Sequence, residues 1–268
     1  MRSRRLDLAS HTLLMRKLSL FAAVAVLALA SDVSAAVTCS VKSVELPDAF
    51  AGQQLLVSDD GRDVTREATY ASTNPAVAKV DAKGYVSATG DGSATITITR
   101  GGDKLEVPVT VKGFGATARS VDFRTEVMPL LSKHGCNAGG CHGKQSGQNG
   151  FKLSLFGFDT EFDYEAIAKE ARGRRLFAAN PDASLFLVKG AGKVPHGGGK
   201  RLNPDSADYQ VIRRWIASGA PASAPDVPKV TKLRVLPTDA VFKPAQLQQL
   251  AVVAEYSDGS TRDVTRQA

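Results

Sequence analysis

The chain has 268 residues, with 34 Lys and Arg against 27 Asp and Glu, and therefore a formal net charge of +7. No Lys/Arg run is interleaved with aromatic residues, so the excess charge predicts a solvated surface and argues against nucleic-acid binding. Only three cysteines and four histidines are present, which restricts any metal or thiol chemistry to a few positions.

Residues 1–35 have the pattern of a secretory signal peptide. A basic start is followed by a stretch without charges, Leu18 to Ala30, and then by small residues up to Ala36. This order predicts export to the periplasm or the cell surface, with Met15 as an alternative start to Met1. A membrane anchor is the less favoured alternative, because Asp32 and small residues follow where a stop-transfer segment would be basic. Removing five basic and two acidic residues with the leader lowers the charge from +7 to +4.

Residues 37–113 are predicted to form an all-β sandwich. Polar and apolar residues alternate over 95–99 and 105–111, and Gly-rich or Asp-rich turns separate such stretches. A two-residue period interrupted by tight turns is typical of short paired strands. No polar cluster converges here, so this domain is expected to be structural.

A repeat extends the sandwich prediction to the end of the chain. Residues 60–68, DGRDVTREA, recur as DGSTRDVTRQA at 258–268, again after a strand-like stretch. Repeated supersecondary units leave such signatures. We therefore expect a second sandwich to begin at 229 and to be incomplete at 268. The chain would then be the N-terminal part of a longer protein, with residues 229–268 disordered or loosely paired alone.

Residues 118–221 have a different, helix-forming composition. A helix is predicted over Ser206–Ser218, where four apolar residues share a face and Gly219 follows. A second is predicted over Asp163–Arg174, with acidic residues early and basic residues late. An apolar helical stretch precedes Cys136, and residues 222–228 are predicted to be a linker.

The motif CNAGGCHG, residues 136–143, combines two cysteines and a histidine. In c-type haem attachment two thiols bind the porphyrin and the adjacent histidine ligates the iron, so Cys136, Cys141 and His142 fit those roles. The usual gap between the cysteines is two residues, whereas here it is four. A Cys136–Cys141 disulfide remains an alternative in an oxidising compartment. A zinc site completed by His134 or His196 is another, although side chains at adjacent positions diverge.

A six-coordinate haem iron needs a second axial ligand, usually Met or His. Met128 is the only methionine left after the leader, and its apolar surroundings predict a core position. His196, in the glycine-rich stretch VPHGGGK, is the better candidate, because glycines let the backbone approach a flat cofactor. The alternative for His196 is a solvent-exposed loop histidine. His134 is predicted to lie at the surface or near a haem propionate rather than to ligate the iron. An apolar wall for the haem is expected from Phe123, Leu130, Phe156, Phe158, Leu187 and Trp215.

Two resemblances follow from these residues. Residues 38–113 and 229–268 resemble the bacterial Ig-like group 2 module, through DGRDVTREATYASTNPAVAKVDAKGYVSATGDGSATITI and the later DGSTRDVTRQA. Residues 118–221 resemble the cytochrome-c-like domain of large secreted planctomycete-type proteins, through CNAGGCHGKQSGQNGFKLSLFGF, VPHGGGKRL and IRRWIASGAP. The resemblance implies a multidomain chain in which an Ig-like sandwich, a mainly α haem domain and a truncated Ig-like sandwich follow one another.

The expected function is therefore covalent haem c binding and electron transfer, with Cys136 and Cys141 as tethers and His142 and His196 on the iron. No motif specifies the redox partner or a role for Cys39, and the Ig-like parts could contact a cell surface or carbohydrate. The alternatives are a non-catalytic adhesion or spacer protein with a Cys136–Cys141 disulfide, and a structural zinc site. An enzyme is less expected, since no Gly-x-Ser-x-Gly or His-Glu-x-x-His motif occurs. Enzymatic activity would lie in a missing C-terminal part.

Overall fold

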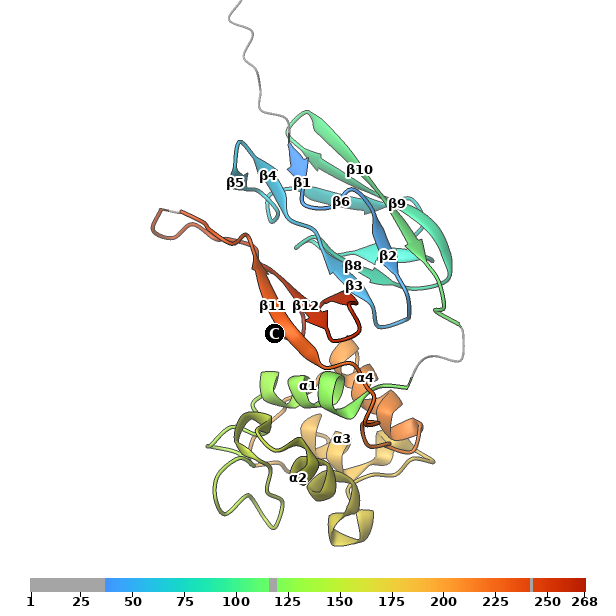
Figure 1. Ribbon diagram of the computed structural model, residues 1–268, viewed down its shortest axis with the longest axis vertical. Coiled ribbons are helices and arrows are strands. Elements are labelled where there is room, and N and C mark those ends of the chain that lie inside the picture. The colour runs from blue at the N-terminus through green and yellow to red at the C-terminus, as the bar shows by residue number, and fades with distance from the viewer. Residues whose placement is uncertain (1–36, 116–119, 242) are drawn as a thin grey trace, which may run out of the picture. The chain divides into compact units, whose positions relative to one another are not determined.

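The computed structural model describes residues 37–115, 120–241 and 243–268 (Figure 1). The expected signal peptide, 1–35, lies outside the described residues, as do both candidate start methionines. None of the helices in the described ranges has the length and apolar character that crossing a bilayer requires.

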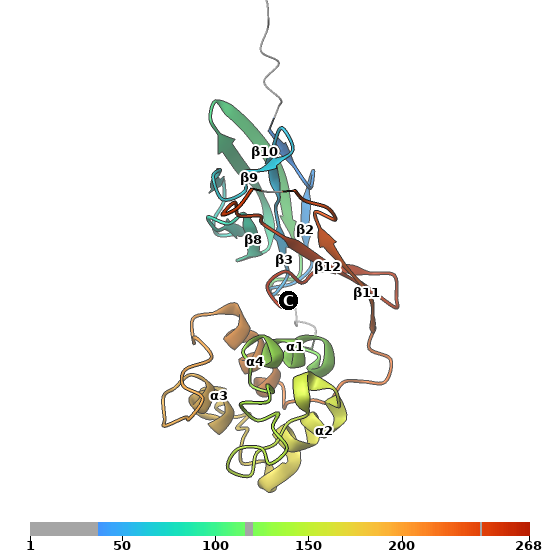
Figure 2. The ribbon, with the colours of Figure 1, turned by 90° about the vertical axis from the view of Figure 1, so that its left-hand side faces the viewer.

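Residues 38–111 form β-strands only, as alternation predicts. The strands are β1 (Thr38–Cys39), β2 (Val44–Leu46), β3 (Gly52–Gln54), β4 (Val57–Asp59), β5 (Arg62–Asp63), β6 (Thr69–Ser72), β7 (Ala78–Val80), β8 (Tyr85–Ala88), β9 (Gly92–Arg100) and β10 (Asp103–Val111). They pair in the orders β2-β10-β9-β6, β3-β8-β7 and β1-β4-β5. β2 runs parallel to β10, whereas β9 and β10 form a long antiparallel pair that Figure 2 shows side by side.

One core joins these sheets. Alternate residues of the long pair are buried, namely Ala94, Ile96, Ile98, Val107, Val109 and Val111, and they pack in one cluster with Val57 of β4 and Val86 of β8. Each fully buried Val or Ile side chain stabilises the fold by roughly 1.5–3 kcal/mol. The prediction of an all-β sandwich is confirmed.

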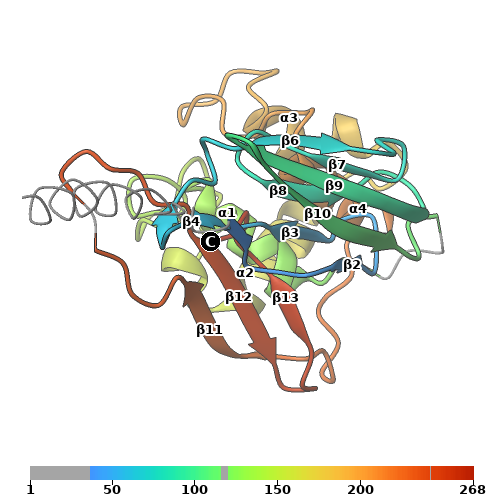
Figure 3. The same ribbon diagram turned by 90° about the horizontal axis from the view of Figure 1, so that it is seen from above.

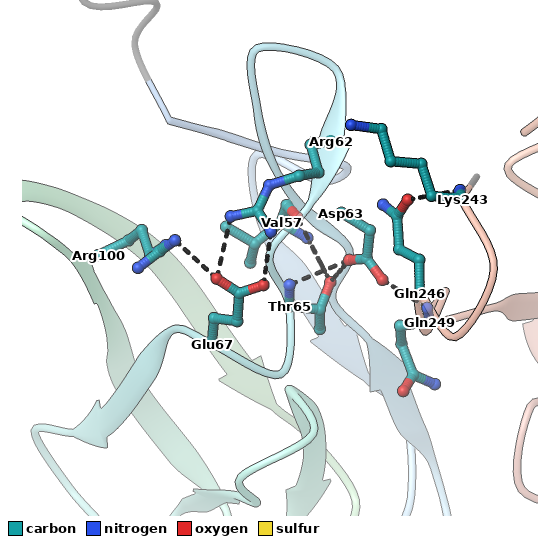
Figure 4. Close-up of polar contacts among 9 residues, drawn as sticks. All are labelled: Val57, Arg62, Asp63, Thr65, Glu67, Arg100, Lys243, Gln246 and Gln249. Carbon is teal, nitrogen blue, oxygen red and sulfur yellow. Dashed lines mark hydrogen bonds and ion pairs between the residues drawn. The ribbon is translucent and has the colours of Figure 1, made fainter. Parts of the chain in front are cut away.

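The repeated Asp-Val-Thr sequence forms a corner stabilised by side chains (Figure 4). Asp63 accepts hydrogen bonds from the Thr65 amide (3.0 Å) and hydroxyl (2.5 Å), and Thr65 Oγ1 accepts from the buried Val57 amide (2.8 Å). Beside it, Glu67 pairs with Arg62 (2.8 Å) and Arg100 (2.6 Å). The Arg62 hydrogen bond lowers the pKa of Glu67, but exposed pairs of this kind contribute little stability.

The second copy of the repeat forms the same corner. Asp263 accepts from the Thr265 amide at 2.9 Å, and Thr265 Oγ1 accepts from the Val252 amide at 2.8 Å. Because the corner recurs with its hydrogen bonds, the sequence repeat is also a structural repeat.

Thr65→Val should test this corner. Valine has nearly the same shape, but it leaves the buried Val57 amide without an acceptor, which costs about 1–3 kcal/mol of unfolding free energy. Urea unfolding followed by β-sheet circular dichroism would measure the loss. Thr99→Val is the matched control, because Thr99 is exposed on β9. Equal stability of the two variants would contradict the role given to the Thr65 hydroxyl.

Residues 229–241 and 243–268 include paired strands, as the repeat predicts. β11 (Val230–Leu236), β12 (Ala251–Tyr256) and β13 (Thr261–Asp263) form an antiparallel sheet, visible from above in Figure 3. β11 pairs with β12 along its whole length, and Arg234 forms an ion pair with Glu255 at 2.7 Å. This ladder satisfies the backbone polar groups between the strands, which explains why they pair. Residues 222–228 contain neither helix nor strand.

The described residues from 120 to 221 are helical, with one isolated β-bridge between Gln148 and Phe151. The α-helices are α1 (Met128–Lys133), α2 (Thr160–Tyr164), α3 (Leu185–Gly190) and α4 (Ala207–Ala217). π-Helical segments span Phe123–Val127 and Glu165–Lys169, and 3-10 turns span Leu155–Gly157, Glu170–Gly173 and Pro181–Ala183.

The helix predicted over Ser206–Ser218 is confirmed as α4. Ser206 caps its start by accepting from the Tyr209 amide at 3.2 Å, and Gly219, with φ of 90°, follows its end. Its predicted apolar face is buried, namely Val211, Ile212, Trp215 and Ile216. The helix carries the largest buried side chain of this domain, Trp215.

The helix predicted over Asp163–Arg174 has different limits. It begins at Thr160, where Asp159 caps the Phe162 amide at 3.0 Å, and it ends at Lys169. The reason for the early end lies with Arg175. Its buried guanidinium donates to the carbonyls of Ala166 (2.7 Å) and Glu170 (3.3 Å), so a side chain satisfies backbone groups that a longer helix would use.

Candidate cofactor site

The Cys136–His142 loop is compact despite its four-residue gap. It leaves α1 at Gly135, with φ of 69°, and closes when the His142 amide donates to the Cys136 carbonyl at 3.0 Å. Gly143 fits only because it lacks a side chain, since a Cβ there would lie 2.0 Å from the Asn137 carbonyl oxygen. The loop therefore brings His142 back beside the start of the motif.

The three cysteines of the described residues are free thiols. Cys136 packs against the helical core, and burial raises the pKa of its thiol to about 11. The neighbouring Cys141 adds to this rise, and the positive charge of Arg201 opposes it. Cys136 is consequently a neutral thiol near pH 7.

The segment after the motif runs along the Cys136–His142 loop. His142 Nδ1 lies 3.0 Å from the Phe151 carbonyl, the Leu153 amide donates to the His142 carbonyl (2.8 Å), and the Phe156 amide donates to the Asn137 carbonyl (3.1 Å). Within this segment Leu153 is buried in the core, whereas Phe156 is 65% exposed.

The structure brings His142 and His196 together although they are fifty-four residues apart in the chain. Their ring centroids lie 6.3 Å apart and their planes differ by 11°. Each Nδ1 faces a backbone carbonyl, that of Phe151 for His142 (3.0 Å) and that of Gly199 for His196 (2.8 Å). A carbonyl only accepts hydrogen bonds, so the Nδ1 of each ring donates to its carbonyl.

The electrostatics keep His142 in its neutral form. Burial lowers its pKa, the hydrogen bond to the Phe151 carbonyl opposes this shift, and the charges of His196 and Arg175 lower the pKa further. A neutral imidazole is the form that binds metals.

Neither His134 nor Met128 is placed to ligate a metal ion together with His142 and His196. His134 Nε2 is 2.8 Å from Asp208 at the start of α4, and Lys133 pairs with the same carboxylate at 2.8 Å. Met128 is a core residue, 3% exposed, as predicted. Within the described ranges, no three or more His, Cys, Asp or Glu side chains gather closely enough to hold a metal ion.

The six residues expected to wall a haem lie in two kinds of position, buried and exposed. Phe123, Leu130, Leu187 and Trp215 are buried in the helical core, and Phe156 and Phe158 are 65% and 93% exposed. Aromatic rings that far inside pack on one another, as Phe123 does on Trp215 at 5.2 Å. They belong to the core and do not line a cavity beside the histidines.

Two residues near His142 were not predicted from the sequence. The ring of Phe151 lies 4.5 Å from that of His142, and the guanidinium of Arg175 lies 4.5 Å over the Phe151 ring. Arg175 comes directly after the predicted helix Asp163–Arg174. No local pattern distinguishes it from Arg174, because its role depends on carbonyls supplied by distant turns.

Comparison with known proteins bears on the first sandwich. Residues 66–102 match the family "Intimin, immunoglobulin-like domain". An Ig-like domain is thereby supported at β6 to β9, and the match does not extend to residues 120–221. No curated protein matches the chain.

Two solved structures are similar to part of the chain. Domains 4 and 5 of the S-layer protein SbsC are 24% identical, with a TM-score of 0.26, and the match covers 30% of this chain and 53% of that one. Domains 5–6 of the same protein are 23% identical, with a TM-score of 0.25, and the match covers 30% of this chain and 44% of that one. This chain thus spans about half the length of the S-layer chains it matches.

Proposed function

We propose that residues 118–221 form an exported, c-type-cytochrome-like domain that binds haem covalently and transfers electrons. Cys136 and Cys141 would tether the haem, and His142 and His196 would occupy the two axial positions of its iron. When bound, the haem iron would supply a one-electron change between its ferrous and ferric states.

The observation that carries the proposal is the geometry of His142 and His196. Metal–imidazole bonds are about 2 Å long, so two imidazoles on opposite sides of one ion have ring centres about 6 Å apart. The centroid separation of 6.3 Å agrees with that value.

The surroundings of both rings suit axial ligands. Metal-binding histidines usually donate the second ring N–H to a carbonyl or carboxylate, which fixes the ring and raises its basicity. Here Phe151 and Gly199 supply those carbonyls. The Cys136 and Cys141 thiols lie in the same loop as His142, which the tether requires.

The Ig-like parts would display this domain outside the cytoplasm, at the periplasm or the cell surface. The signal-peptide pattern of residues 1–35 and the match of residues 66–102 to the intimin Ig-like domain family support this location.

The proposal is tested by the absorption spectrum of the full chain, produced by export together with c-type haem maturation. We expect a Soret band that survives acid–acetone extraction, because thioether bonds resist that treatment. The double variant Cys136→Ser/Cys141→Ser should release its haem into the acid–acetone, whereas Cys39→Ser should retain the haem. Colourless wild-type protein with a Cys136–Cys141 disulfide would favour the adhesion or spacer alternative, and stoichiometric zinc would favour a structural metal site; either result overturns the proposal.

A further inference from the structure

The loop that carries His196 is closed at its base by the backbone. The amides of Arg201 (2.8 Å) and Leu202 (2.9 Å) both donate to the Gly190 carbonyl, at the end of α3. Gly190 and Leu202 approach so closely that a Cβ on the glycine would lie 3.0 Å from the leucine Cδ1. The base of the loop is therefore firmly defined.

The tip of this loop has few other restraints. It contains three consecutive glycines, 197–199, and Gly197, Gly199 and Pro195 are exposed. Within the tip, the Gly199 amide donates to the His196 carbonyl at 2.9 Å. Glycines lose more conformational freedom on ordering than other residues do, so this tip needs external contacts to hold His196 in one place.

Two cationic side chains supply such contacts on either side of His196. Lys189 Nζ donates to the Pro195 carbonyl at 2.6 Å, and Arg201 Nε donates to the Gly198 carbonyl at 2.7 Å. Charged donors form stronger hydrogen bonds than neutral donors. The ammonium of Lys193, in the same loop, donates to neither of these carbonyls.

Arg201 also reaches the loop that carries the cysteines. Its Nη1 lies 3.9 Å from the position that a Cβ on Gly135 would take, and its charge opposes the burial effect on the Cys136 thiol. One guanidinium thus lies between the His196 loop and the Cys136 loop.

We propose that Arg201 and Lys189 are positioning residues that hold the tip of the His196 loop, and that Arg201 links it to the Cys136 loop, so that together they control how readily His196 leaves the haem iron. This inference rests on the proposed function. Removing either donor frees one carbonyl of the tip and lets His196 move away more often. The residues act through the loop backbone and contact no iron ligand atom themselves.

The rate of CO binding to the ferrous protein tests how readily His196 leaves the iron, because CO can bind only after His196 has dissociated. We expect Arg201→Met and Lys189→Met each to speed CO binding by about fivefold to tenfold, the factor given by one hydrogen bond of typical net strength. Arg201→Lys should restore part of the wild-type rate, since lysine can donate to the same carbonyl. Lys193→Met is the matched control for charge in the same loop, and its rate should stay at the wild-type value.

Amide hydrogen exchange in haem-free full-length protein tests the same contacts without iron. Peptides covering residues 193–202 should exchange faster in Arg201→Met and Lys189→Met than in Lys193→Met. Absence of a Soret band in the wild type would refute the proposed function but leave this exchange test intact. The positioning role would be overturned if amide exchange stayed at the wild-type rate in Arg201→Met and Lys189→Met, or if Lys193→Met exchanged as fast as they do. It would also be overturned if exchange became faster in these variants but CO binding to the haem-loaded protein did not.

Discussion

His196→Ala should convert the haem-loaded protein from a low-spin to a high-spin species. With His142 alone on the iron the sixth position is empty or holds water, and such weak-field coordination favours the high-spin state. The Soret position, the loss of resolved α and β bands and the electron paramagnetic resonance spectrum of the ferric form would record the change. The covalent haem content should stay constant, because Cys136 and Cys141 are untouched.

His134→Ala is the control for this experiment. His134 lies two residues before Cys136, but its Nε2 is 2.8 Å from Asp208. The variant should therefore retain the low-spin spectrum and lose only a partly exposed contact. A low-spin spectrum in His196→Ala, or a high-spin spectrum in His134→Ala, would show that the distal ligand is misassigned.

Trp215→Ala should produce the largest loss of stability in the helical domain. The side chain is fully buried, packs on Phe123 at 5.2 Å and donates its indole N–H to the Pro221 carbonyl at 2.9 Å. Replacing a core tryptophan by alanine costs roughly 3–5 kcal/mol, which includes the cavity left behind. Urea unfolding followed by circular dichroism at the helical band would measure it, at equal haem content.

Phe158→Ala provides the comparison, because this aromatic side chain is 93% exposed. Its unfolding free energy should lie within about 0.5 kcal/mol of the wild type. A loss below about 1 kcal/mol in Trp215→Ala would mean that the core adjusts around the cavity, contrary to the close packing of Trp215 on Phe123.

Local sequence patterns predicted those helices and strands whose position is determined by residues within the element itself. α4 was predicted nearly to the residue, because its cap, apolar face and terminating glycine are all contained in residues 206–219. The β-sandwich was predicted in the same way, because alternating apolar and polar residues within a strand indicate which of its faces is buried. The helix near residue 165 was misplaced at both ends, because Arg175 ends it through contacts that no short window contains.

The candidate site, too, was predicted only in part from the sequence. The adjacency of Cys141 and His142 and the glycines around His196 pointed to the residues, since tethering and ligand chemistry depend on residue type and spacing. Four residues of the expected apolar wall lie in the helical core, because periodicity marks a residue as apolar but does not say whether its partner is another side chain or a cofactor. Phe123 and Trp215 have each other as partners.

The sequence by itself determined that the chain contains a repeated β-module and, between its copies, a helical segment with one compact group of cysteines and histidines. Only the tertiary structure decided that His142 faces His196, that His134 turns to Asp208 instead, and that Arg201 lies between two loops. These relations join residues up to about 74 positions apart, and chain folding creates them through packing that no local period encodes.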